Sequence, residues 1–270
     1  MHNQAGMKVE TFRGVPVYSF DLLGRWPGLV QATFTRIGGV SAPPYDTLNV
    51  SFAVQDDHER VRANRELMAA AIEWDPARIV SARQVHGRRA VAVGRGAVGA
   101  PDVPDCDALV TDEPGVLLLM KFADCVPITL WDPVRRVVAL VHAGWRGTVL
   151  GAPAAALELM VRRYRSRPSD VVAAVGPSIG PCCYQVGKDV AILASRTFAG
   201  TDVLQGGHAG EIRLDLWAAN AETLMRAGVM EENIAIAGIC TRCRSDLFFS
   251  HRAAGGRTGR FGVVAGIRDE

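Results

Sequence analysis

A chain of 270 residues can hold one large domain or two small ones. Hydrophobic residues make up 49% of it and charged residues 21%, which is typical of a globular protein with a substantial core. The net charge is +2 and the basic residues are scattered arginines, so composition does not favour nucleic-acid or membrane-surface binding. Because no leader and no long apolar run is visible, we expect a cytoplasmic protein. The six cysteines are expected as free thiols or metal ligands.

The predicted elements mix strands and helices without regular alternation. Residues 1–10 are expected to be a loose N-terminus. Strands are predicted at Val15–Phe20, Val30–Arg36, Ile79–Val85, Ala90–Val93, Asp107–Thr111, Val116–Phe122, Val126–Trp131, Val137–Val141, Val171–Val175, Ile234–Ile239 and Phe261–Ile267. Helices are predicted at Asp57–Trp74, Val149–Arg165, Lys188–Phe198 and Leu216–Ala227. We therefore predict a single α/β domain over residues 1–270, a sandwich with a mixed β-sheet.

A β-hairpin is predicted around the turn signal Asp132-Pro133. If the turn is centred between Pro133 and Val134, Cys125 faces His142. Their Cβ atoms would then lie about 4.5–5.5 Å apart, which suits two ligands of one metal ion. A buried cysteine and a hydrogen-bonded core histidine would explain the same pattern.

His86 is a third candidate ligand, because it also lies at the end of a predicted strand, next to a glycine. Two histidines and one cysteine leave a tetrahedral zinc one open position, which is the catalytic pattern. The same set is compatible with copper. Pattern alone does not place His86 beside the hairpin, and a solvated histidine is the alternative. Asp124 can cap a turn or support the ligands from behind.

Several arginines lie beside glycines at predicted turns. The guanidinium groups of Arg36, Arg146 and Arg260 are suited to phosphate or carboxylate binding, although a single loop arginine is more often only solvated. A helix expected to begin near Thr148 would offer free N–H groups to an anion. No Walker-type or Rossmann glycine pattern is present.

The remaining cysteines and histidines give weaker signals. Cys240 and Cys243 form a single CxxC, which together with Cys182-Cys183 could supply a structural zinc site, but adjacent cysteines rarely supply two tetrahedral ligands. Three of the other four histidines are expected to be solvated or to lie in the loose N-terminus: His2, His58 and His208.

Taken together, these motifs resemble the bacterial polyphenol oxidase or laccase-domain family. The similarity extends over roughly residues 15–267. It rests on Thr35-Arg36, Gly38–Ser41, Gln84–Gly87, Asp107–Thr111, Ala123-Asp124-Cys125, His142–Gly147, Ile179–Pro181, Cys183-Tyr184, Leu214–Leu216 with Asn220, Cys240-Thr241 and Phe248–Ser250 with Arg252, Gly256 and Thr258–Arg260. Two departures are Gln185, where many relatives have Glu, and Phe122, where a small polar residue is common.

The resemblance implies one zinc ion held by His86, Cys125 and His142 in a single laccase-domain-type α/β domain. It also implies purine nucleoside phosphorylase activity on adenosine, inosine or methylthioadenosine, and adenosine deaminase activity. We expect His86, Cys125, His142 and Arg36 to be catalytic. Phosphate and substrate are expected to bind at Arg36, Asn49, Arg146 and Arg260.

Other functions are compatible with these residues. One is a copper-dependent polyphenol oxidase, although multicopper chemistry needs many histidines and the chain has six. Another is a hydrolase that edits peptidoglycan precursors, with Cys125 as nucleophile and His142 as base. A structural zinc in a binding protein is a further alternative. No nucleic-acid or membrane partner is expected, and a monomer and a homodimer are equally compatible with the sequence.

Overall fold

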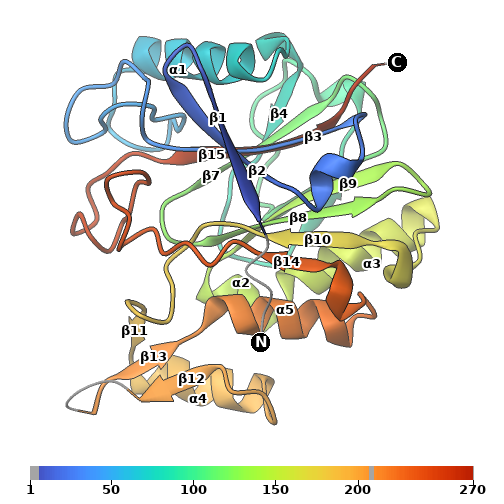
Figure 1. The fold of residues 1–270 in the computed structure, drawn as a ribbon, viewed down its shortest axis with the longest axis vertical. Helices are drawn as coiled ribbons and strands as arrows, with labels where there is room; N and C mark the ends of the chain where they lie inside the picture. Colours follow the sequence, from blue (N-terminus) through green and yellow to red (C-terminus); the bar gives the residue numbers. More distant parts are fainter. Residues whose placement is uncertain (1–5, 207–209, 270) are drawn as a thin grey trace.

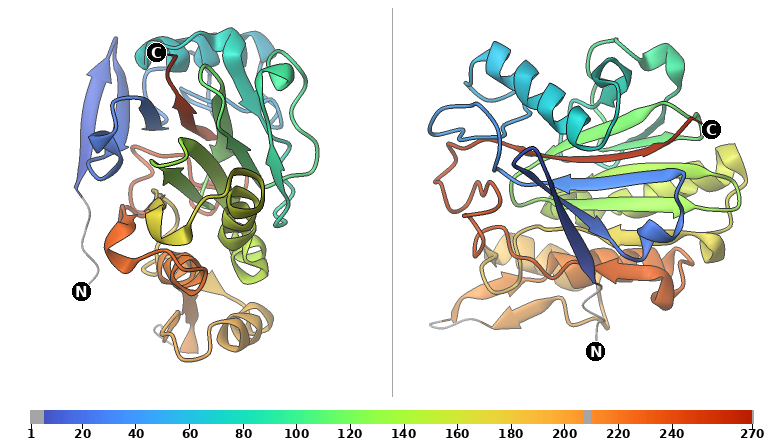
Figure 2. Two further views of the ribbon diagram at one scale, coloured as in Figure 1. Left: turned by 90° about the vertical axis from the view of Figure 1, so that its right-hand side faces the viewer. Right: turned by 45° about the horizontal axis from the view of Figure 1, so that its top comes forward.

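The computed structural model describes residues 6–206 and 210–269. Two six-stranded sheets pack against each other, and helices cover their outer faces (Figures 1 and 2). Sheet 1 has the order β1 (Met7–Phe12), β2 (Val15–Phe20), β3 (Leu29–Phe34), β15 (Phe261–Ile267), β7 (Leu117–Phe122) and β4 (Ile79–Ser81). Sheet 2 has the order β14 (Ile234–Ile236), β10 (Val172–Val175), β8 (Val126–Asp132), β9 (Val137–Ala143), β6 (Ala108–Thr111) and β5 (Ala90–Ala92).

The helices and a small third sheet complete the described chain. The α-helices are α1 (His58–Ala71), α2 (Trp145–Leu150), α3 (Ala152–Tyr164), α4 (Lys188–Thr197) and α5 (Leu216–Arg226). Short 3-10 helices span Leu23–Arg25, Pro76–Arg78, Arg95–Ala97, Pro168–Asp170 and Glu231–Asn233. The small sheet, in the order β11 (Gln185–Val186), β13 (Ile212–Leu214) and β12 (Leu204–Gly206), lies beside α4 at one end of the molecule (Figure 1).

The fold is mixed α/β, as predicted, but with two large mixed sheets in place of one. Sheet 1 is antiparallel except where β4 runs parallel to β7. In sheet 2 the edge strands β14 and β5 are parallel to their neighbours, and the other pairs are antiparallel. No helix within the described ranges is long and apolar enough to cross a membrane.

The core follows from the alternation of side chains along the strands. In β9, Val137, Ala139 and Val141 belong to the core beneath α2 and α3, whereas Val138 and Leu140 pack against sheet 1. Fully burying such a side chain contributes about 1.5–3 kcal/mol. His142 is next in the row of Val138 and Leu140, so the alternation directs its ring to the space between the sheets.

The predicted hairpin of β8 and β9 is confirmed, but its predicted register is wrong. Asp132 pairs with Val137 and Pro127 with His142, so four residues form the turn instead of two. The Asp132 carboxylate accepts the N–H groups of Val134 and Arg135 at 2.9 and 3.0 Å, which stabilises the wider turn. Cys125 therefore lies just before β8 and not opposite His142.

Two other predictions need correction. The expected loose start fails at residues 7–10, because β1 pairs with β2 from Met7 to Phe12; residues 1–5, including His2, lie outside the described chain. His208 also lies outside it. The predicted helix Val149–Arg165 is in fact α2 and α3, separated at Gly151, whose φ of 76° is left-handed. The first of these helices begins at Trp145, not near Thr148.

Candidate metal centre

Three candidate ligands meet where the chain passes between the two sheets. His86 lies in the connection from β4 to β5, Cys125 in the three-residue link from β7 to β8, and His142 near the end of β9. Their ligand atoms all lie within 4.8 Å of one another. The two imidazole rings are 4.9 Å apart between centroids, edge to face. The fold therefore brings together all three residues that the sequence singled out.

Asp107 orients two of these residues from behind. Its buried carboxylate lies 2.8 Å from Nδ1 of His142 and accepts the backbone N–H groups of His86 and Gly87 at 2.9 and 2.7 Å. Burial would raise the pKa of Asp107, but the His142 ring and these N–H groups lower it below its usual value. Because a carboxylate only accepts, Nδ1 of His142 carries a proton, which leaves Nε2 as the nitrogen that would bind a metal once its own proton is released.

The ionisation of Cys125 and His142 is coupled. Burial alone would raise the pKa of the Cys125 thiol, but the imidazoles of His142 and His86 outweigh it and lower the pKa to about 6. Burial would lower the pKa of His142, but the Cys125 thiolate and Asp107 raise it to about 9. The metal-free pair is therefore a thiolate beside an imidazolium, and the thiolate is the form that binds metals.

The short link that carries Cys125 is held from several sides. Asp124 has a φ of 90°. Its carboxylate accepts hydrogen bonds from the Oγ1 hydroxyl of Thr241 and from the backbone N–H of Arg252, each at 2.7 Å. Its carbonyl accepts the N–H of Ile179 at 2.9 Å. Asp124 therefore ties the Cys125 link to two distant loops.

Small and large side chains shape the space around the ligands. A Cβ on Gly144 would lie 3.0 Å from Sγ of Cys125 and 3.1 Å from Cδ2 of His86, so only glycine leaves the donors undisturbed. Phe122, the unusual residue before Ala-Asp-Cys, is buried and packs on the His142 ring with a centroid distance of 5.5 Å. Its aromatic ring thus packs on one of the candidate ligands.

A pocket of about 460 Å³ opens beside the three residues. It is lined by Ser51, Ala53, Ala82, Arg83, Gln84, His86, Asp102, Lys121, Ala123, Asp124, Cys125, His142, Ile179, Tyr184, His251, Arg252 and Arg260. Four of these are Lys or Arg and two are Asp. Both carboxylates are already engaged, since Asp102 pairs with Lys121 at 2.9 Å and Asp124 accepts two hydrogen bonds. The pocket is therefore suited to an anionic ligand.

Only one of the four predicted substrate-binding residues lines this pocket. Arg260 does so, anchored by hydrogen bonds from Nη1 to the carbonyls of Thr258 and Gly259. Arg36 instead pairs with Asp46 at 2.9 Å and donates to the carbonyl of Ser245.

Asn49 and Arg146 also lie outside the pocket lining. Asn49 is buried, donates to Asp56 at 2.8 Å and accepts the N–H of Arg260 at 2.9 Å, so it positions the chain at Arg260. Arg146 is exposed and stacks on the Trp145 ring. Direct contact of Arg36, Asn49 or Arg146 with a substrate stays a prediction.

The sequence interpretation missed several pocket residues. The side chain of Lys121 is only 8% exposed and donates to Ser81, Ala82 and Asp102; burial lowers its pKa, opposed by Asp102. Lys121 could have been recognised from the sequence, because it is the one charged residue in an otherwise apolar strand. Tyr184, His251 and Arg252 come from loops whose convergence no local pattern encodes.

The fold and donor residues define a class of mixed α/β proteins with a candidate mononuclear metal site of the His2Cys type. The family model described as multi-copper polyphenol oxidoreductase laccase matches residues 30–268, and the chain belongs to this family.

Relatives are similar along most of their length. A purine nucleoside phosphorylase named YlmD from Geobacillus stearothermophilus is 40% identical over 251 residues, covering 90% of this chain and 92% of that protein. The purine nucleoside phosphorylase YfiH of Escherichia coli is 32% identical, with 86% and 92% coverage. The crystal structure of Geobacillus stearothermophilus YlmD matches with a TM-score of 0.92 at 36% identity, covering 98% of this chain and 100% of that one.

Proposed function

We propose that this protein is a zinc-dependent purine nucleoside phosphorylase that cleaves adenosine, inosine or methylthioadenosine with inorganic phosphate. The observation that carries the proposal is the His86–Cys125–His142 set opening into a pocket lined by Arg260, Arg252 and Lys121. The names of the relatives support the same reaction.

The donor chemistry fits zinc. Two imidazoles and a thiolate are ligands that zinc prefers. The three ligand atoms lie within 4.8 Å of one another, so they need to approach one another only slightly for a central ion to bind each at about 2.0–2.3 Å. When bound, zinc would supply a Lewis acid beside the pocket. Copper is the alternative ion, because the same donors suit it.

The residues of the pocket provide the other requirements of phosphorolysis. Cleavage of a nucleoside C–N bond develops positive charge on the sugar, so a positioned phosphate stabilises the transition state. Arg260 and Arg252 are placed to bind phosphate, whereas Lys121 is already paired with Asp102 in the pocket wall. His251, the pocket-lining imidazole outside the donor set, is the candidate to protonate the leaving base.

Adenosine deamination is a second proposed activity of the same pocket. It needs a group that carries protons between water and the purine ring. The carboxylates of the lining, Asp102 and Asp124, are both engaged by other groups, so we expect phosphorolysis to be the faster reaction.

A thiol hydrolase acting on a peptidoglycan precursor is the runner-up. Cys125, His142 and Asp107 have the order of a nucleophile, a base and an orienting carboxylate. A sulfur bound to zinc is not free to attack, so metal content separates the two functions. A multicopper oxidase is less favoured: within the described residues, groups of potential ligands occur at two places, with two histidines at one and none at the other.

The test is base release from adenosine and inosine, measured with and without phosphate, alongside metal quantification. We expect one zinc per His2Cys site and release that depends on phosphate. Cys125→Ala should lose both, whereas Cys106→Ala, which changes a buried cysteine outside the pocket, should retain both. Base release without phosphate, or full turnover by metal-free protein, would contradict the proposal.

A further inference from the structure

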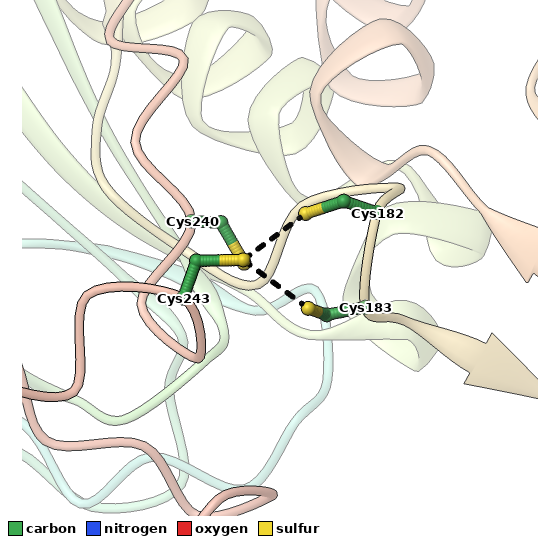
Figure 3. Close-up of side chains that lie close together, drawn as sticks. All are labelled: Cys182, Cys183, Cys240 and Cys243. Carbon is green, nitrogen blue, oxygen red and sulfur yellow. Dashed lines mark hydrogen bonds between the residues drawn. The ribbon is translucent and has the colours of Figure 1, made fainter.

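A second group of cysteines meets at the back of the pocket wall. Cys182 and Cys183 lie in the turn after β10, and Cys240 and Cys243 in the turn after β14. Their four Sγ atoms all lie within 4.8 Å of one another, and Sγ of Cys243 is 3.6 Å from Cys182 and 3.4 Å from Cys183. Figure 3 shows the side chains of both turns pointing toward one another.

We propose that these four cysteines bind a structural zinc ion, separate from the His2Cys site. A tetrahedral site with Zn–S bonds of about 2.3 Å places neighbouring sulfurs about 3.8 Å apart, close to the spacing found here. An all-sulfur tetrahedral set is a typical zinc environment in proteins. Because four protein ligands fill the coordination sphere, this ion would stabilise the structure without binding substrate.

The geometry favours a shared ion over a single disulfide. Sγ of Cys243 is nearly equidistant from two partners, so no unique pair is selected, and both separations far exceed the S–S bond of about 2.05 Å. In addition, the N–H of Gly180 donates to Sγ of Cys240 at 3.3 Å. Hydrogen bonds of this kind support a coordinating thiolate. Adjacent cysteines become usable as two ligands because the turn at 180–184 presents both toward Cys243 (Figure 3).

The site would fix one wall of the substrate pocket. The first turn also carries Ile179 and Tyr184, which line the pocket, and the second carries Thr241, which binds Asp124 at 2.7 Å. Ser178 and Cys240 already form a parallel bridge between the two segments. Four zinc–sulfur bonds would connect the two segments next to that bridge and would limit the motion of the loops around Cys125.

The first experiment counts zinc in purified protein by elemental analysis and native mass spectrometry. Wild type should hold two zinc ions per chain, Cys243→Ser one, Cys125→Ser one, and the double variant none. Cys106→Ala, which changes the remaining cysteine, should keep two. One ion in wild type that disappears in Cys125→Ser would overturn the inference while leaving the proposed function intact.

A second measurement needs no variant. Cys182 and Cys243 are exposed, so they should react readily with iodoacetamide unless a metal holds them. In wild type we expect removal of zinc by a chelator to speed the alkylation of these two cysteines by at least about tenfold. Equal rates, or an intact mass showing a disulfide among these cysteines, would refute the zinc site.

Discussion

Asp107 gives the sharpest test of the candidate metal centre. Replacing it with asparagine keeps its shape but removes the charge and turns one acceptor oxygen into a donor. In the wild type, His142 Nδ1 and the N–H groups of His86 and Gly87 donate to the carboxylate at 2.7–2.9 Å. The new amide NH2 group of the variant must therefore face at least one of these donors. Losing one charged hydrogen bond and weakening the others should cost about 2–4 kcal/mol of unfolding free energy. Zinc affinity should fall about 10–100-fold, because the His142 ring loses its orienting acceptor.

The assays are urea unfolding of metal-free protein and zinc competition against a chelator. Because the folded-state pKa of Asp107 is lowered, its stabilisation is present above the unfolded carboxyl pKa of about 3.9 and is lost as pH falls through the folded value. The difference between Asp107→Asn and wild type should therefore be full at neutral pH and shrink in acid. Asp112→Asn, on an exposed residue at the other end of β6, is the control. Zinc affinity within twofold of that control would refute the orienting role.

Three further predictions concern the ligand set and the pocket. In metal-free protein, alkylation of Cys125 should rise with pH to a plateau, with its midpoint near pH 6, since burial is outweighed by the imidazoles; a midpoint near the free-thiol value of about 8.5 would contradict this. Gly144→Ala should weaken zinc binding and cost about 1–3 kcal/mol in unfolding experiments, whereas Gly206→Ala, with open space around it, should change neither. Arg260→Gln should raise the KM for phosphate about tenfold to a hundredfold at constant zinc content, and an unchanged KM would exclude Arg260 from phosphate binding.

Local patterns predicted the elements best where a run of strand-forming residues is bounded by turns on both sides. The strands Val15–Phe20 and Phe261–Ile267 have the predicted bounds, because each is a short run of strand-forming residues between turns. The hairpin register was missed because the side chain of Asp132 stabilises a four-residue turn. That interaction depends on three-dimensional detail that an Asp-Pro signal does not contain.

For the candidate site, too, the sequence was informative about the residue types but not about their arrangement. The types of the three donors indicated a metal, but their convergence depends on tertiary structure. His86 reaches the others from a left-handed conformation with φ of 61°, held by the carboxylate of Asp107. The four-cysteine cluster combines turns about sixty residues apart, and neither turn alone indicates a complete site.

The link of three residues between β7 and β8 has a consequence for how the family can vary. Sliding one strand by a single residue moves its atoms by about 3.3 Å, whereas metal–ligand distances tolerate about 0.2 Å. Since the thiol lies on this link and one imidazole on β9, the affinity for an ion bound at this centre would depend on how the two sheets are aligned. Substitutions between the sheets, such as at Leu140 or Val263, can therefore alter metal affinity without touching a ligand. Insertions in the link would disturb the centre far more than insertions in outer loops.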